Sequence, residues 1–369
     1  MEIQEYLNHM KEIQQSLLKY IEEDKNDEEN FHNLSKIFHE QKIRHHRHKL
    51  KSLFHLIVQI SNNHRRPPGF FDKISMVLLK FRNKINKHFS NFEIFNIFKS
   101  NKRIILLLFE ENILKMDESI ALSMTHFPYL DACYPQYFFN EIKPFLTEEM
   151  IEKITPQISD NFEEKRKIGE SHHRLCEMIR NDKVKEFTKY AKKEQLSLDA
   201  KIEPSIFETN SFLIDKKPTL IQYASFFGSI QILKHLLSNH VSVNSSVWLY
   251  AVHCQNPELL LLFKDNHHNP KYKSYEECVK ESIKCHHNEL AKYLQENFVQ
   301  KEKNKSVDLF SGSLKYYNFM FIENDFSNTS GFYDLCKYDY FPIVHELMKT
   351  KDIFGERNKS NKRTIFIPN

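Results

Sequence analysis

The sequence predicts an all-α fold built from a row of stacked helical hairpins. Apolar residues recur at helical spacing along most of the chain, and one helix–turn–helix pattern is repeated several times. Only six glycines occur in 369 residues, which argues against a β-sandwich or barrel with many tight turns and against glycine-rich nucleotide loops. A single hairpin cannot bury its apolar face alone, so the units are expected to form a solenoid.

The clearest copy of the hairpin lies in residues 218–244. Thr219 is placed to cap a first helix, because its hydroxyl can accept from a free backbone N–H. Gly228 should end that helix, since the residue just past a helix end often needs positive φ. The apolar core positions of the two helices are Ile221, Ala224, Ile232, Leu233, Leu236 and Leu237.

Less regular copies lie on both sides of this unit. Ala224, Ala251 and Ser282 occupy equivalent positions, 27 and 31 residues apart. In the other copies a different residue takes the place of the turn glycine. These expected turn residues are Asn101, Asp182, Gln255, His286 and Asp339.

This order of residues resembles the ankyrin repeat. Thr219, Ile221, Ala224 and Gly228 fall where that family has the Thr, Leu, Ala and Gly of its TPLHxAAxxG motif, and the spacing of the copies is close to its period of roughly 33 residues. Val243 and Asn244 match the closing Val-Asn of the family. The chain departs from the motif at Leu220, Gln222 and His240, where the family has Pro, His and a second Gly.

Over nearly its full length the chain resembles a group of ankyrin-repeat proteins that is expanded in trichomonad protists and carries a domain of unknown function. The phrases that carry this resemblance include SNNH at 61–64, NIFKSNKR at 96–103, EPSIFETNSFL at 203–213 and QYASFFGSIQI at 222–232. The resemblance implies protein–protein recognition by analogy of fold, and it implies no particular chemical activity.

The hairpin pattern, its resemblance to the ankyrin repeat and one charged stretch lead us to expect four parts of the chain. Residues 1–169 form an N-terminal helical region with degenerate ankyrin-like hairpins, and residues 170–299 form ankyrin repeats. Residues 300–312 are a charged linker, and residues 313–369 hold a C-terminal ankyrin repeat followed by a truncated last unit.

Charge and cysteine content favour a cytoplasmic protein, with a nuclear location left open. The net charge is only +4, and the six cysteines follow no disulfide framework, which is typical of reduced thiols. The N-terminus has the pattern of a charged amphipathic helix, so no signal peptide is expected. No apolar run approaches the roughly 18 residues of a membrane span.

Cysteine and histidine gather at one place, yet we expect no metal, no cofactor and no enzyme activity. Cys278, Cys285, His286 and His287 form the densest cluster, with His253–Cys254 one unit earlier. Their spacing fits no zinc-binding pattern, and turn positions favour polar capping residues. No phosphate loop, nucleophile elbow, HExxH motif or EF-hand loop occurs.

The positions just before each turn are the candidate sites for an unidentified protein partner, because ankyrin proteins often use them in this way. The two adjacent phenylalanines at this position in the clearest copy are either exposed anchors or packed, at least one of them, against the next unit near Trp248. The candidate partner-binding residues are Phe226, Phe227, His253, Lys284, Lys337 and Tyr338.

Two basic runs, at 42–51 and 359–363, offer an alternative function. They could contact nucleic acid or an anionic membrane surface. The favoured interpretation of 42–51 is the solvated start of a helix whose apolar side includes Leu50, Phe54 and Ile57. Since one basic run does not make a groove, no nucleic acid partner is expected.

Overall fold

The computed structural model describes residues 3–23, 27–126, 133–154, 161–265, 272–299, 309–322 and 329–350. Within these ranges every regular element is a helix, which confirms the all-α prediction. Extended pairing among them is limited to an isolated antiparallel bridge between Lys201 and Thr219. The second basic run, at 359–363, and most of the predicted linker lie outside the described residues.

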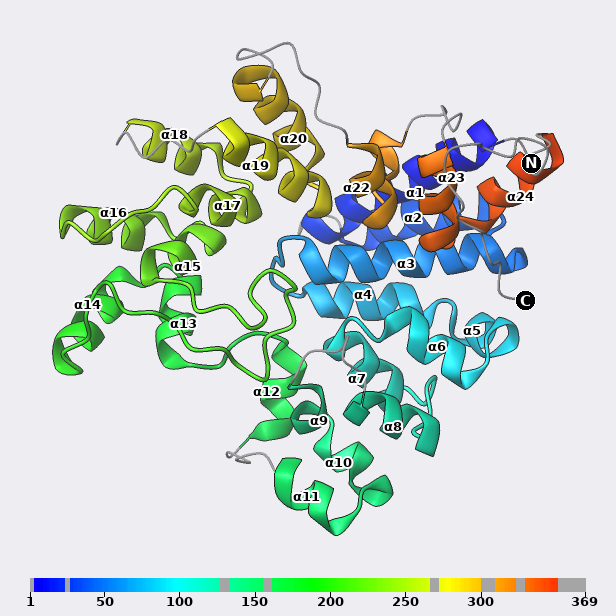
Figure 1. Ribbon diagram of the computed structural model, residues 1–369, viewed down its shortest axis with the longest axis horizontal. Coiled ribbons are helices and arrows are strands. Elements are labelled where there is room, and N and C mark those ends of the chain that lie inside the picture. The colour runs from blue at the N-terminus through cyan, green and yellow to red at the C-terminus, as the bar shows by residue number, and fades with distance from the viewer. Residues whose placement is uncertain are drawn as a thin grey trace, which may run out of the picture.

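In the N-terminal region the first helices lie beside α3, and the later ones lead away from it (Figure 1). Its longer helices are α1 (Ile3–Glu22), α2 (Asp27–Glu40), α3 (Arg47–Asn63), α4 (Phe70–Leu79), α5 (Arg82–His88), α6 (Asn91–Phe98), α7 (Lys102–Glu110) and α8 (Glu118–His126). The rest of the region forms short helices: α9 (Tyr134–Tyr137), α10 (Phe139–Ile142), η2 (Lys143–Phe145), α11 (Glu148–Ile154) and α12 (Phe162–Ile168). A further short helix, η1 (Ile43–His45), precedes α3.

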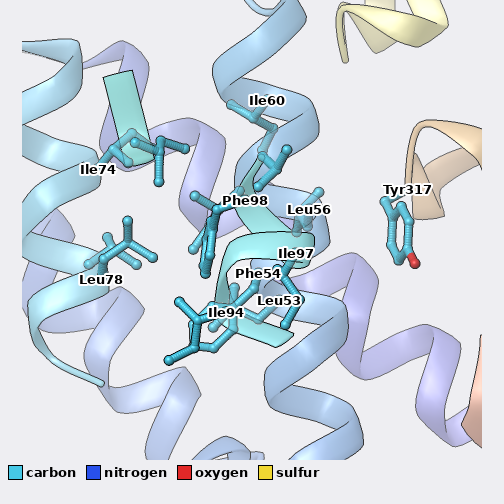
Figure 2. Close-up of a cluster of buried hydrophobic side chains, with 14 of the residues drawn as sticks. Leu53, Phe54, Leu56, Ile60, Ile74, Leu78, Ile94, Ile97, Phe98 and Tyr317 are labelled. Carbon is cyan, nitrogen blue, oxygen red and sulfur yellow. The ribbon is translucent and has the colours of Figure 1, made fainter. Parts of the chain in front are cut away.

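The core of this region gathers around α3 because that helix is apolar on several faces. Leu53, Phe54, Leu56, Ile57 and Ile60 are all fully buried. Figure 2 shows side chains of α4 and α6 against one side of α3, and a tyrosine from the C-terminal part of the chain toward its other side. The core therefore draws on segments far apart in the sequence.

The stretch from Phe70 to Ile85 has apolar residues at helical spacing, but it does not form one continuous helix. It forms α4 and α5, which are separated at Lys80 and Phe81. Phe81 leaves the helical conformation, with φ −105° and ψ 5°. Its fully buried ring then packs edge-on against Phe38 and Phe54, with centroids 5.1 Å and 6.2 Å away. Burial of this ring in the core accompanies the break in the helix.

Helical hairpins follow from residue 174 onward. The first helices of successive units are α13 (Arg174–Arg180), α15 (Leu220–Phe227), α17 (Val247–Ala251) with η3 (Val252–Cys254), α19 (Tyr272–Lys284), α22 (Phe310–Lys315) and α23 (Thr329–Lys337). The second helices are α14 (Val184–Lys193), α16 (Ile230–Ser238), α18 (Pro257–Asp265), α20 (Asn288–Leu294) with η4 (Gln295–Val299), η5 (Phe319–Phe321) and α24 (Phe341–Thr350). First helices contact first helices along the row, from α13 through α15 and α17 to α19 and α22.

The turn inside each unit contains a residue with positive φ, as predicted at four non-glycine positions. The φ values are 49° at Asp182, 54° at Gln255, 61° at His286 and 62° at Asp339, and the expected turn Gly228 has φ 70°. The sequence did not predict a similar turn at Tyr317, where φ is 54°. Five turns share one hydrogen bond, in which the next amide donates to the carbonyl five residues back at 2.9–3.0 Å; its acceptors are Met178, Ala224, Ser282, Ser313 and Leu335.

The prediction for Asn101 is wrong. Its φ is −128°, and its side-chain oxygen accepts from the Ile104 amide at 3.0 Å, so it caps the start of α7 and does not occupy a left-handed turn. Its amide group also donates to Asn62 Oδ1 at 2.8 Å, and its side chain is fully buried. The helix cap and the bond to α3 together explain the extended conformation.

Gln14 of α1 joins the N-terminal region to the hairpins. This fully buried side chain donates to Asn318 Oδ1 at 2.8 Å, lies 3.0 Å from His286 Nδ1, and accepts from the Phe319 amide at 2.8 Å. Burial lowers the pKa of His286 to about 3, so its ring is neutral and Nδ1 can accept from Gln14. One glutamine thus satisfies polar groups of two successive hairpins.

The end of α3 makes a second connection to the same turn. His64, which is fully buried, contacts the Cys285 carbonyl oxygen through Nδ1 at 2.7 Å, and its Nε2 lies 3.0 Å from Glu22 Oε1. A long insertion, residues 194–219, connects α14 to α15. Ser211 of this insertion donates from its amide to the Asn62 carbonyl at 2.9 Å. The sequence SNNH therefore contacts both the hairpins and the insertion.

The last hairpins return to the beginning of the chain. Figure 1 shows α22–α24, in orange and red, beside α1–α3 in blue, and contacts join α24 to α1 and to α3. Leu314, Phe319, Leu335 and Ile343 share one hydrophobic core with the N-terminal helices, whereas most buried hydrophobic residues between Leu175 and Val299 form a separate core. The row of hairpins is thus closed onto the N-terminal region.

Replacing Gly228 with alanine should destabilise the protein more than the same change at Gly69. Both glycines have positive φ, which costs an alanine roughly 1–2 kcal/mol. A Cβ at Gly228 would lie 3.0 Å from Cys254 Cβ, whereas a Cβ at Gly69 would meet nothing within 4 Å. Thermal unfolding of Gly228→Ala and Gly69→Ala measures the difference; equal melting temperatures would contradict the importance of the Cys254 contact.

Gln14→Leu should lower the free energy of unfolding by at least about 2 kcal/mol, because it leaves several buried polar groups without their partner. Gln15→Leu is the matched control, since its side chain is exposed on the same helix. That control should change stability by no more than about 0.5 kcal/mol. Urea unfolding compares the two variants, and similar midpoints would show that Gln14 does not hold the regions together.

Candidate functional site

Three predicted partner-binding residues lie on one face of the hairpin row. Phe226, His253 and Lys284 stand at the ends of α15, η3 and α19, which contact one another in sequence. We call this surface the pre-turn face. It is the surface that the sequence singled out for an external protein.

A segment of the insertion, residues 211–216, covers the pre-turn face. The ring of Phe212 lies 6.0 Å from that of Phe226 and 4.3 Å from that of His253. Asn210 positions Phe212 locally, because its side-chain oxygen accepts from the Phe212 amide at 2.9 Å in a short turn. Lys216 places its ammonium 3.4 Å from the centroid of the Phe212 ring. The face is thus engaged within the chain.

This arrangement decides between the two alternatives that the sequence left open for the phenylalanines. Only 8% of Phe226 and 1% of His253 is exposed, and their rings stack on each other at 4.5 Å. Phe227 is half-buried beside Tyr223, with the Arg180 guanidinium 6.0 Å from its ring centroid. At least one phenylalanine is therefore packed, and the packing of Phe226 involves Phe212 and His253.

The two other predicted residues, Lys337 and Tyr338, lie at the turn of the last hairpin. Lys337 is exposed, and its ammonium lies 5.2 Å from the centroid of the Tyr338 ring. Tyr338 is half-buried, and its carbonyl accepts from the Tyr317 hydroxyl.

Behind the pre-turn face, His253, Glu281 and Cys285 bring three potential metal ligands together. Their nitrogen, oxygen and sulfur atoms all lie within 4.8 Å of one another. His253 Nε2 is 3.2 Å from Glu281 Oε1, and Cys285 Sγ is 4.0 Å from each of these atoms. Glu281 lies in the last turn of α19, and Cys285 follows directly after that helix; its amide donates to the Glu281 carbonyl at 2.9 Å, so the two side chains project from the same face.

Burial and charge set the protonation of this cluster. Burial works to raise the pKa of Glu281, but His253 and Lys284 outweigh it and lower the pKa to about 2. Burial lowers the pKa of His253 despite the neighbouring carboxylate. It also raises the pKa of the Cys285 thiol well above its usual range. At neutral pH the cluster therefore holds a carboxylate, a neutral imidazole and a thiol.

Cysteine, histidine and carboxylate also make up nucleophilic triads, but this arrangement does not present a nucleophile. A reactive cysteine needs a stabilised, accessible thiolate. Cys285 is fully buried, and its thiol keeps its proton. The same three residue types are ordinary zinc ligands, so coordination is the chemistry that the cluster fits.

Glu281 connects the cluster to the surface. It lines an open pocket of about 440 Å³ between the insertion and α19, and Lys284 donates to its Oε1 at 2.9 Å. The lining alternates positive and negative side chains beside one aromatic ring; its residues are Ser211, Phe212, Lys216, Leu249, Glu277, Lys280, Glu281 and Lys284. Solvent and small ions can approach the Glu281 carboxylate from this side.

The sequence identified only part of this cluster. Cys285 and His253 meet, whereas His286 and His287 point to other partners: Gln14 and the Val252 carbonyl. Cys278 is fully buried elsewhere on α19. Glu281 was missed, although its spacing of four residues from Cys285 was a signal available in the sequence. The proximity of His253 to Cys285, which belong to two different units, could not be predicted from their spacing in the sequence.

Several residues of the first basic run, 42–51, form ion pairs or hydrogen bonds within the chain. Arg47 pairs with Glu93, and Lys51 pairs with Asp339 of the last hairpin. Lys49 is buried and donates to the Gln41 carbonyl at 3.1 Å. The solvated character expected of this run is found at Lys42 and at 44–46.

Asp339→Asn should reduce stability near neutral pH and have less effect in acid. Burial works to raise the pKa of Asp339, but His55 and Lys51 outweigh it and hold the pKa below its ordinary value of 3.8. A lowered folded-state pKa adds stability above 3.8, and this is lost as the pH falls through the folded-state value. Because 39% of the side chain is exposed, solvent screening keeps the contribution small.

The test compares melting temperatures of the two proteins at about pH 7 and about pH 3. Asparagine tolerates the positive φ of this turn, so the variant keeps the backbone conformation. Lys51→Gln in both backgrounds completes a double-mutant cycle and isolates the ion pair. A gap in melting temperature that does not narrow in acid would contradict the prediction.

No helix in the described part of the chain is long and apolar enough to cross a membrane. Comparisons with protein-family models, curated proteins and solved structures find no match to this chain.

Proposed function

We propose that this protein is an ankyrin-type helical-hairpin solenoid that acts as a non-enzymatic scaffold for binding another protein. The observation that carries the proposal is the repeated turn. Units that differ in sequence place a positive-φ residue at the same point, and five of the turns share one hydrogen-bond register. Such regular stacking is typical of repeat proteins, whose extended surfaces bind partners.

The last hairpin is the surface we assign to the partner. The pre-turn face is engaged with residues 211–216, whereas α23 and α24 expose large side chains. Tyr333 is 57% exposed, Phe341 45% and Met348 41%. The predicted residue Lys337 is exposed four positions after Tyr333 on α23. Exposed aromatic rings of this kind are common anchors in protein interfaces.

Phe341 is held in place before any partner arrives. Its ring stacks on His48 of α3 at 4.1 Å and lies 5.6 Å from the ring of His345. A ring fixed by such contacts loses little conformational entropy on binding, and this favours affinity. The same stacking attaches the surface to the N-terminal region, so the surface is complete only in the intact chain.

Affinity capture with the intact chain, followed by variants, tests the proposal. Tyr333→Ala should weaken retention of the captured protein by about tenfold, as expected for an interface anchor. Tyr293→Ala is the matched control, since that tyrosine is 41% exposed on α20, away from the last hairpin. Equal loss with both variants, or no loss with Tyr333→Ala, would overturn the assignment of this surface.

Salt separates the scaffold from the alternative of an electrostatic module on nucleic acid or membrane. Binding through apolar and aromatic contacts should persist at high salt, because those contacts are not screened. Binding to phosphate groups falls steeply as salt rises. Retention that disappears at high salt would favour the basic surface around Lys42 and Arg44, and would count against the scaffold.

A further inference from the structure

We propose that His253, Glu281 and Cys285 form a binding site for one divalent cation of the zinc class. The site brings together the three ligand types that zinc prefers: an imidazole nitrogen, a carboxylate oxygen and a cysteine sulfur. Two of the three side chains, His253 and Cys285, are almost completely buried. This inference does not depend on the proposed scaffold function.

The ligand atoms form a triangle of the right size. His253 Nε2, Glu281 Oε1 and Cys285 Sγ are separated by 3.2 Å, 4.0 Å and 4.0 Å. Usual zinc bond lengths in a tetrahedron place such atoms roughly 3.3–3.6 Å apart. Sγ lies nearer to Nδ1 of His253, at 3.4 Å, than to Nε2, so the imidazole ring has to turn before one nitrogen faces a cation shared with the other two ligands. Binding replaces the thiol proton of Cys285, which is released to solvent.

The fourth position is available from the pocket. Glu281 lies at the boundary between the buried cluster and the pocket lined by Phe212, Lys216 and Lys284. A water molecule or another small ligand can complete the coordination from that side. Three protein ligands with one open position are a common zinc arrangement.

Changing Lys284 distinguishes a metal site from a simple ion pair, because the lysine has opposite effects on the two. Its ammonium lies 2.9 Å from the same Glu281 oxygen that would bind the cation. The lysine therefore competes with the cation for that oxygen, and its positive charge repels the cation. Removing the lysine charge should strengthen metal binding, although it weakens the ion pair.

A bound cation would also reinforce the link between two units and the N-terminal region. His253 belongs to η3, whereas Glu281 belongs to α19 and Cys285 follows α19 directly, so coordination joins successive hairpins. The carbonyl of Cys285 is in contact with His64 at the end of α3. Metal binding would thus stabilise the closed arrangement, and a rise in melting temperature should accompany it.

Titration of the intact, reduced chain with Co²⁺ tests the site, because Co²⁺ accepts the same ligands and reports on them by absorption. We expect one ion per chain, with a thiolate-to-cobalt charge-transfer band and a spectrum typical of tetrahedral coordination. Zn²⁺ should displace Co²⁺ and raise the melting temperature. A wild-type chain that binds neither ion would overturn the proposal.

Cys285→Ser should abolish the charge-transfer band and weaken binding by at least about tenfold. Cys278→Ser is the matched control, because Cys278 is also fully buried on α19, and it should keep the band. Glu281→Gln keeps the size of the side chain and should likewise weaken binding. It provides the test if Cys285→Ser fails to fold. A band that survives in Cys285→Ser would overturn the site.

Lys284→Gln completes the test. If the lysine competes with the cation, this variant should bind Co²⁺ several-fold more tightly than the wild-type chain. Unchanged or weaker binding in Lys284→Gln would contradict coordination by the Glu281 oxygen. The partner capture described above does not depend on these outcomes, so the two proposals can fail separately.

Discussion

The architecture depends on the requirement that buried polar groups find partners. Gln14 stands on the first helix, yet it pairs with His286, Asn318 and Phe319, which follow hundreds of residues later. In a dry interior each of these groups would be destabilising without its hydrogen bond. The N-terminal region therefore fits the hairpins in one register, which apolar packing alone would specify less strictly.

Local features of the fold could be predicted because they depend on short stretches of sequence. Helical periodicity predicted most helices, and Thr219 caps α15 in a capping box with Gln222, as its position suggested. Asp182, Gln255, His286 and Asp339 were predicted at turns by alignment with Gly228, and all have positive φ. Asn101 failed because asparagine is equally suited to capping a helix, and the sequence alone does not choose between these uses.

Contacts between distant segments could not be predicted in the same way. The candidate residues Phe226 and His253 were correctly placed before turns, but nothing local indicates that Phe212 covers them. The fit of Tyr317 and Tyr340 into the N-terminal core was also missed, because their rings meet α1 and α3 only after the chain has closed. Helical spacing places Glu281 beside Cys285, and the stacking of successive units brings His253 to both of them.

Closure changes how such a protein can vary. In an open row of repeats each unit contacts only its neighbours, so stability is nearly a sum of local terms and units can be gained or lost. Here α24 contacts α1 and α3, and the last hairpins share a core with the first helices. Inserting or deleting one unit would rotate the last hairpins and move α24 away from α1 and α3. The number of units is therefore fixed by geometry, and the ends of the row should unfold together with the N-terminal helices instead of fraying independently.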